Sequence, residues 1–298
     1  MLLTRPATTR MYQNHTLDSA RWDHFAPRND DIVIATPYKS GTTWMQIIVM
    51  YLVFRDLHIR PVSELSPWFE LRWADSLADL LKKVEAQQHR RFIKTHLPLD
   101  GLPYFEQVKY IVVGRDPRDV FMSMWHFYAG FEDALYEQVN SGWAGKPFPR
   151  CPEDIHAFWQ GWIGQGWFEW EREGYPFWSN MRHVQTWWDF KHLPNILFVH
   201  FNDLLSNLEG EIQRIAEFLE IPLAPSFCSQ VTEAATFRNV KAKAEQLGSS
   251  QGFFYKGTNG RWRSVLTDAE LELYRATVAR ELSPDCARWL ENGHHTTL

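Results

Sequence analysis

Four short apolar runs divide the chain, and each is typical of a strand buried on both faces. They are residues 31–36 (DIVIAT), 91–95 (RFIKT), 109–114 (KYIVVG) and 195–200 (NILFVH). All are rich in β-branched residues and nearly continuous in apolarity, whereas a strand with one face in water would alternate apolar and polar residues. The pattern therefore predicts a sheet that is covered on both sides.

Segments of helical period separate these runs. We expect helices over residues 42–54, 77–87, 118–127, 180–190 and 209–219. Strands that alternate with helices predict an α/β fold with a central parallel sheet flanked by helices. Because no repeat, low-complexity tract or linker divides the chain, we expect a single domain over residues 1–298. Such sheets bind ligands at the carboxyl ends of their strands, so the loops that follow the four runs should hold the chemistry.

Composition narrows the classes of function. The chain is 45% hydrophobic and 22% charged, as in ordinary globular proteins, and its net charge of −5 argues against nucleic acid or an anionic membrane as a partner. Cys151, Cys228 and Cys286 are too widely spaced for a disulfide framework or a structural zinc site. No run has the length of a signal peptide or a membrane span, so we expect a cytoplasmic protein. The 15 tryptophans could fill the core or line an aromatic pocket.

The loop after the first run has the features of an anion site. It reads TPYKSGTTW over residues 36–44, between a buried strand and a helix N-terminus, where free backbone N–H groups favour an anion. Lys39 supplies charge, Gly41 permits close approach, and Thr42 and Thr43 add hydroxyl groups. The loop resembles a Walker A loop in mechanics but lacks the GxxxxGK[ST] spacing. An ordinary capped turn is the plainer interpretation.

Two further loops carry candidate side chains. Lys94 and His96 lie in KTHLP at the end of the second run, where a neutral imidazole beside a cation could act as a base. Taken alone, His96 could equally be a structural histidine. Arg115 leaves the third run, and Ser123 follows about two helical turns later, which suits a phosphate. An ion pair of Arg115 with a neighbouring aspartate is the alternative.

A basic, glycine-punctuated loop, FFYKGTNGRWR over residues 253–263, lies near the C-terminus. Alone it could be a solvated surface loop. In this order, however, TPYKSGTTW, KTHLP, Arg115 to Ser123 followed by His126 and Phe127, and KGTNGRW closely resemble the cytosolic sulfotransferase family. The resemblance runs from about residue 30 to 270. The chain is similar to bacterial-type members of that family.

The resemblance implies a specific reaction. It implies transfer of a sulfuryl group from 3′-phosphoadenosine 5′-phosphosulfate (PAPS) to the hydroxyl or amine of a small, partly apolar acceptor by in-line displacement, without a metal. By the same resemblance His96 is the general base, Lys39 stabilises the leaving nucleotide, and Lys94 orients the sulfuryl group. The nucleotide contacts that it implies are Lys39, Ser40, Gly41, Thr42, Thr43, Trp44, Arg115, Ser123, Phe201, Phe237, Lys256 and Gly257.

The acceptor pocket is expected from two aromatic segments. Its predicted lining is Trp68, Phe69, Leu71, Trp73, Phe127 and Tyr128. The long aromatic segment 132–170 is expected either to form a lid over this pocket or to pack as ordinary core. The sequence does not identify the acceptor, because pocket shape cannot be read from residue types.

The chain departs from the family pattern at several positions. Tyr255 stands where the family has an arginine that holds the 3′-phosphate, unless Arg261 or Arg263 replaces it. Phe201 occupies the place of a tyrosine, and Ala235 that of a threonine, which both contact adenine in the family. Residues 263–272 also lack the family's dimerisation segment. These differences leave tight PAPS binding and the oligomeric state open.

Three alternatives remain at the level of the sequence. A P-loop-like kinase that uses ATP would need a lysine directly after the last loop glycine, where this chain has Thr42. A non-catalytic homologue that binds PAPS or its product would not need Lys39, Lys94 and His96 together. A sulfotransferase acting on a glycan or a protein tyrosine is the third, although such relatives are usually anchored in a membrane.

Overall fold

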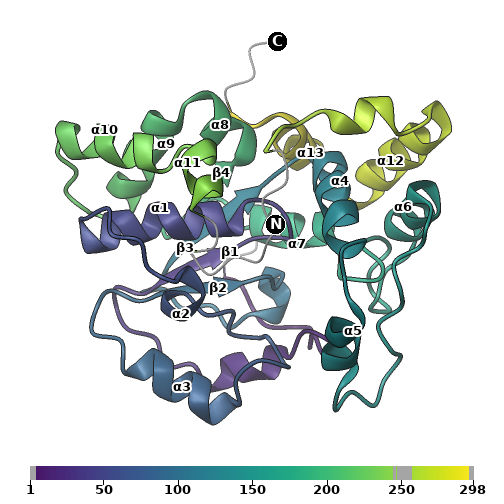
Figure 1. Ribbon diagram of the computed structural model, residues 1–298, viewed down its shortest axis with the longest axis horizontal. Helices are drawn as coiled ribbons and strands as arrows, with labels where there is room; N and C mark the ends of the chain where they lie inside the picture. Colours follow the sequence, from purple (N-terminus) through teal and green to yellow (C-terminus); the bar gives the residue numbers. More distant parts are fainter. Residues whose placement is uncertain (1–4, 244–245, 247–256, 295–298) are drawn as a thin grey trace.

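A parallel four-stranded sheet lies at the centre of the protein (Figure 1). The computed structural model describes residues 5–243, 246 and 257–294. The strands are β1 (Ile32–Ala35), β2 (Phe92–Thr95), β3 (Lys109–Gly114) and β4 (Ile196–His200), in the order β2-β1-β3-β4. All neighbouring pairs are parallel. The four predicted strands and the α/β class are confirmed, with the strands trimmed by at most two residues.

The five predicted helices are present with small shifts at their ends. They are α1 (Thr42–Phe54), α3 (Leu77–Glu85), α4 (Pro117–Tyr128), α7 (Asn180–Trp188) and α9 (Leu208–Phe218). The remaining helices are α2 (Val62–Leu65), α5 (Asp133–Asn140), α6 (Ile155–Gly164), α8 (Phe201–Ser206), α10 (Pro225–Ala234), α11 (Phe237–Ala242), α12 (Asp268–Glu281) and α13 (Pro284–Asn292). Short 3₁₀ helices are η1 (Ser19–His24), η2 (Leu99–Gly101) and η3 (Arg261–Ser264).

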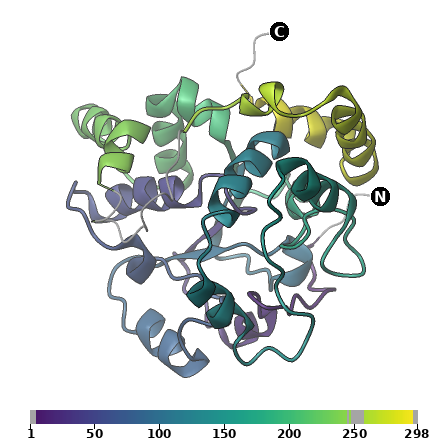
Figure 2. The same cartoon turned by 45° about the vertical axis from the view of Figure 1, so that its right-hand side comes forward.

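The two faces of the sheet pack into separate hydrophobic cores. Successive side chains of a strand point to opposite faces, so Ile32 and Ile34 join the core under α1, α9 and α10, whereas Val33 and Ala35 join the core under α4, α6 and α7. Burial on both sides explains why the strands are continuously apolar. Figures 1 and 2 show α1 with α8–α11 in one group and α4, α6 and α12 in another.

The strand order creates a crevice at the carboxyl ends of β1 and β3. The chain passes from β1 into α1 on one face of the sheet, and from neighbouring β3 into α4 on the other face. Where adjacent strands feed helices on opposite faces, their loops diverge and leave room for a ligand. The loops that carry Lys39 and Arg115 are these two.

The part of the N-terminal segment around His15 lies beside α5 (Figure 1). Arg72 joins the two, because its guanidinium donates to the carbonyl oxygens of His15 at 3.1 Å and Val139 at 2.8 Å. Within the described ranges, no helix combines the length and apolarity that a membrane span needs, and no three His, Cys, Asp or Glu side chains gather as metal ligands.

The tryptophans divide between core and cavity. Four tryptophans are fully buried in the core under α4, α6 and α7, namely Trp22, Trp159, Trp162 and Trp187. Another four line the cavity described below. Both interpretations of the high tryptophan content are therefore correct, each for different residues.

Candidate active site

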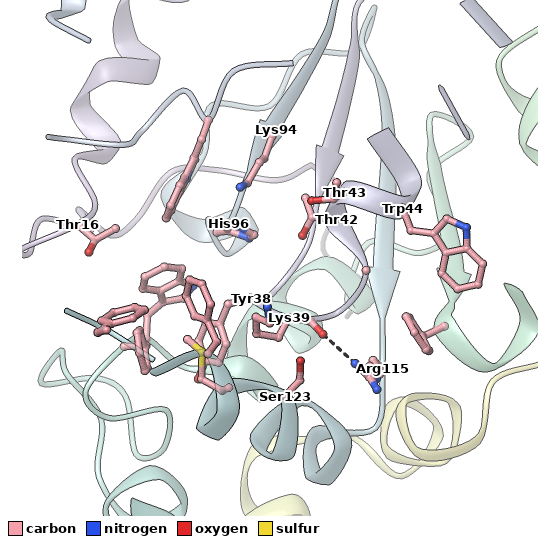
Figure 3. Close-up of a pocket in the computed structure, with 18 of the residues that line it drawn as sticks. Thr16, Tyr38, Lys39, Thr42, Thr43, Trp44, Lys94, His96, Arg115 and Ser123 are labelled. Carbon is pink, nitrogen blue, oxygen red and sulfur yellow. Dashed lines mark hydrogen bonds between the residues drawn. The ribbon is translucent and has the colours of Figure 1, made fainter. Parts of the chain in front are cut away.

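A cavity of about 480 Å³ opens at the carboxyl ends of the strands. Its cations are Lys39, Lys94, Arg115 and Arg261. Arg115 lies at one end beside Trp44, and the opposite end is lined mostly by aromatic and aliphatic side chains. Figure 3 shows Lys39, His96 and Ser123 between the two ends. The loops after β1, β2 and β3 thus contribute to one site, together with the described part of the basic C-terminal loop, residues 257–263.

The β1–α1 loop is shaped for close approach of a ligand. Gly41 is the N-cap of α1 with φ 106°, and a Cβ at this position would lie 3.0 Å from the Phe201 ring. Lys39 also has a positive φ, 57°, which is uncommon for a side chain other than glycine. The Thr42 hydroxyl lies 2.6 Å from that of Thr36 at the end of β1. Gly41, Thr42 and Thr43 line the cavity, so the N-terminus of α1, where backbone N–H groups lack helical partners, lies at the site.

Two lysines project into the middle of the cavity over aromatic rings. The Lys39 ammonium lies 4.4 Å from the centre of the Phe127 ring, and the Lys94 ammonium lies 4.6 Å from that of Trp68. Burial, together with the nearby positive charges of Arg115 and Lys94, lowers the pKa of Lys39 to about 7. Burial likewise lowers the pKa of Lys94 to about 8. An anion bound between them would restore both charges.

The His96 ring is held so that one nitrogen is free to act as a base. Its Nδ1 lies 2.7 Å from the carbonyl oxygen of Thr36, which can only accept a hydrogen bond, so Nδ1 carries the proton. Burial and the charge of Lys94 lower the pKa of His96 well below its ordinary value, so the ring is neutral. Nε2 is then the unprotonated nitrogen. This is the state that a general base requires.

A buried carboxylate, Glu70, supports the β2 end of the site. It is 0% exposed and accepts from the backbone N–H of His96 at 2.6 Å and from the Thr95 hydroxyl at 3.1 Å. It also accepts from the indole N–H of Trp68 at 2.6 Å and of Trp22 at 3.0 Å. Four donors to one carboxylate fix the position of the loop and of the Trp68 ring. The sequence analysis did not single out Glu70.

Arg115 faces the cavity instead of pairing with its neighbouring aspartates. Its guanidinium donates to the Asn259 side chain at 2.8 Å and to the Lys39 carbonyl at 3.2 Å, and lies 4.1 Å from the Phe201 ring centre (Figure 3). Asp116 instead binds Arg118, and Asp119 accepts from the backbone N–H of Gly260. The alternative of an Arg115–aspartate ion pair is thus not found. Ser123 lines the same part of the cavity.

Three aromatic rings form the wall beyond Arg115. The Trp44 ring centre lies 5.3 Å from that of Phe201 and 6.1 Å from that of Phe237. The Trp44 indole N–H donates to the Ala235 carbonyl at 2.7 Å, which fixes the ring. Flat rings in such a wall suit a purine base. Gly257 lies against Phe237, because a Cβ there would meet that ring at 2.3 Å.

The basic C-terminal loop is described only in part. Lys256 and Tyr255 lie outside the described residues, so their predicted contribution to nucleotide binding stays a prediction. Arg261 lines the cavity, whereas the Arg263 guanidinium lies 4.6 Å from the Trp262 ring centre. Of the two arginines that could replace the family's arginine, Arg261 is therefore the one at the cavity.

Phe69, Leu71 and Tyr128 were predicted to line the acceptor pocket, but none of the three lines the cavity. Ser40 does not line it either, and its contact with the nucleotide stays a prediction. Phe69 is fully buried against Trp22 in the core, and the Tyr128 hydroxyl donates to the Pro149 carbonyl at 2.5 Å. Leu71 pairs through its backbone with Leu17. Ser40 is fully buried, with its hydroxyl 3.4 Å from the Tyr38 carbonyl.

The apolar end of the cavity combines predicted and unpredicted residues. Trp68, Trp73 and Phe127 line it as expected. Segment 132–170 contributes Leu135, Val139 and Phe148, so it covers this end as a wall. The residues that sequence reasoning missed are Thr16, Tyr38, Met124, Phe131, Phe177 and Trp178. Most belong to loops without a period, and apart from Tyr38, which lies in the TPYKSGTTW loop, no sequence signal marks them.

Comparisons with known proteins identify the family of this chain. The Sulfotransferase domain family matches residues 29–284. A glycolipid sulfotransferase of Mycobacterium bovis is 33% identical, over 97% of this chain and 96% of that protein. Human sulfotransferase 1E1 is 27% identical over 83% of each chain. The crystal structure of mouse sulfotransferase SULT7A1 complexed with PAP shares the fold, with a TM-score of 0.70 and 23% identity over 91% of each chain. The chain belongs to the sulfotransferase family.

Proposed function

We propose that this sulfotransferase uses PAPS as donor and transfers its sulfuryl group to a hydroxyl or amine of a small, partly apolar acceptor. One observation carries the proposal. Neutral His96, with Nε2 unprotonated, lies between a cationic end of the cavity that suits a nucleotide and an apolar end that suits an acceptor. The same cavity holds Lys39 and Lys94, as in-line transfer between two bound molecules requires.

The cationic end fits the two phosphate groups of such a nucleotide. The N-terminus of α1 and Lys39 would hold the 5′-phosphosulfate, and Arg115, Ser123 and Arg261 would hold the 3′-phosphate. Trp44 and Phe237 would enclose the adenine. The SULT7A1 structure, whose fold this chain shares, is a complex with PAP, the nucleotide 3′-phosphoadenosine 5′-phosphate that remains when PAPS loses its sulfuryl group. This complex supports the assignment. The preference for a sulfotransferase over an ATP-dependent kinase rests on the family match.

The proposed chemistry is a direct displacement at sulfur. The acceptor oxygen forms a bond to sulfur while the bond from sulfur to the bridging oxygen of PAPS breaks with its electron pair, and the acceptor proton passes to His96 Nε2. Lys39 offsets the charge that develops on the leaving phosphate, and Lys94 orients the sulfuryl oxygens. No covalent intermediate on the protein is needed, because donor and acceptor occupy one cavity.

The apolar lining favours an uncharged acceptor. Trp73, Phe148 and Val139 offer no countercharge, and a buried ion without a partner is costly. The name of the M. bovis relative, glycolipid sulfotransferase, is consistent with a hydroxyl on a largely apolar molecule. We therefore place phenols, sterols and hydroxylated lipids ahead of charged small molecules as acceptors.

An acceptor screen tests the proposal. Purified protein is incubated with PAPS and a panel of phenols, sterols, hydroxylated lipids and amines, and both PAP and the sulfated product are measured. We expect product with at least one uncharged alcohol or phenol, and a rate lower by about 100-fold or more with the His96→Ala variant. Binding of PAP without transfer to any acceptor would identify instead a nucleotide-binding homologue that lacks activity.

A further inference from the structure

The apolar end of the cavity contains a polar side chain that the proposed reaction does not use. Thr16 lines the cavity, and Figure 3 shows it across from Trp44 and Arg115. Its residue is only 8% exposed, so its hydroxyl has little access to bulk water. A buried hydroxyl must use its hydrogen-bonding capacity within the protein or with a ligand.

The backbone of Thr16 is fixed on both sides. Its N–H donates to the Asn14 side-chain oxygen at 2.8 Å, and its carbonyl accepts from the backbone N–H of Arg72 at 2.9 Å. The Arg72 guanidinium also holds the carbonyls of neighbouring His15 and of Val139 in α5. Thr16 is therefore anchored to the α5 wall of the cavity before any ligand binds.

His15 determines how the Thr16 hydroxyl is oriented. The His15 Nε2 lies 3.1 Å from the Pro176 carbonyl, which only accepts, so Nε2 carries the proton. Burial lowers the pKa of His15 to about 3, so the ring is neutral and Nδ1 has no proton. The Thr16 hydroxyl lies 2.8 Å from Nδ1 and must donate to it. Its proton is thus committed to His15, and its oxygen can only accept from the cavity.

We infer that Thr16 is a specificity residue that accepts a hydrogen bond from a second O–H or N–H group of the acceptor molecule, at the end away from the group that is sulfated. This inference rests on the proposed function. An acceptor with an ether or ketone oxygen at that position would place lone pairs against lone pairs. The lining between Thr16 and His96, which includes Trp68 and Trp178, is aromatic. The preferred acceptor therefore has two polar ends joined by an apolar middle.

Matched pairs of acceptors test the inference. The probes are α,ω-alkanediols of increasing length and their monomethyl ethers, with PAPS as donor. At the chain length that spans the cavity we expect kcat/KM to favour the diol by about 3- to 10-fold, after correction for its two equivalent hydroxyls, the range of one hydrogen bond. In Thr16→Val, which keeps the shape but loses the hydroxyl, the ratio should fall toward that of the shortest diols.

Two controls make the result decisive. Thr16→Ser keeps the hydroxyl and should keep the preference, and comparing ratios between variants cancels the different hydration of diol and ether. Equal kcat/KM for diol and ether in the wild type, or an unchanged ratio in Thr16→Val, would overturn the inference. If the wild type sulfates no probe, the acceptor screen above decides the proposed function separately. In that case the ratio of the Kd values for ether and diol, measured by calorimetry with the PAP-saturated protein, tests the Thr16 subsite. Wild type should favour the diol, and Thr16→Val should not.

Discussion

His96 depends on a single backbone contact for its role. The Thr36 carbonyl at 2.7 Å holds the Nδ1 proton, so Nε2 is left for the acceptor. We expect His96→Ala to lower kcat by about 100-fold or more, the usual contribution of a general base, and to leave the Kd for PAP nearly unchanged. Steady-state kinetics and PAP calorimetry measure the two effects. His192→Ala, which removes an exposed histidine, is the matched control.

Glu70 stabilises the site through four hydrogen bonds at one buried carboxylate. In Glu70→Gln, one oxygen becomes an NH₂ group that cannot accept, so either Trp22, which donates to Oε2, or Trp68, which donates to Oε1, loses its partner. We expect the free energy of unfolding to fall by about 1–3 kcal/mol, the cost of a buried donor that loses its partner. Urea denaturation measures this. Glu64→Gln, at an exposed position of α2, should change it little, and equal effects in both variants would contradict the assignment.

At the level of single elements, the start of α1 requires Gly41. Alanine there would be strained at φ 106° and would lie 3.0 Å from the Phe201 ring. We expect Gly41→Ala to cost about 1–3 kcal/mol of stability and to weaken PAP binding, since the loop must shift. Gly164→Ala is the matched control, because its Cβ would meet nothing within 4 Å near the end of α6. Thermal denaturation and PAP calorimetry on both variants decide the point.

The sequence predicted the elements well wherever one pattern decided the structure. The strands are buried on both faces, so their apolar runs were clear, and α1 follows β1 at the predicted residue Thr42. Helices α5 and α6 were not predicted, because segment 132–170 carries aromatic residues on several sides. Lys39 and Arg115 could be predicted, since their loops follow β1 and β3 directly. Thr16 and Trp178 could not, because long-range contacts alone bring them to the cavity.

At the scale of the whole molecule, the site gathers positive charge although the chain is acidic. The net charge is −5, yet Lys39, Lys94, Arg115 and Arg261 line one cavity. Because a neutral lysine is favoured in a buried site, the pKa of Lys39 falls to about 7 and that of Lys94 to about 8. At a pH below these values, both lysines are already charged and bind an anion without taking up a proton. Above them, each lysine must take up a proton when an anion binds.

The affinity for PAP should therefore fall as pH rises from about 7 to 9, by up to about one decade per pH unit for each lysine that must be reprotonated. The second ionisation of a phosphate, near a pKa of about 6, acts only at lower pH and does not mask this range. Calorimetry at pH 8.5 in buffers of different ionisation enthalpy should show net proton uptake on PAP binding, and much less at pH 6.5. Lys39→Met should reduce the uptake, whereas Lys82→Met, on the exposed side of α3, should leave it as in the wild type. A pH-independent Kd without proton exchange would mean that neither lysine contacts the nucleotide.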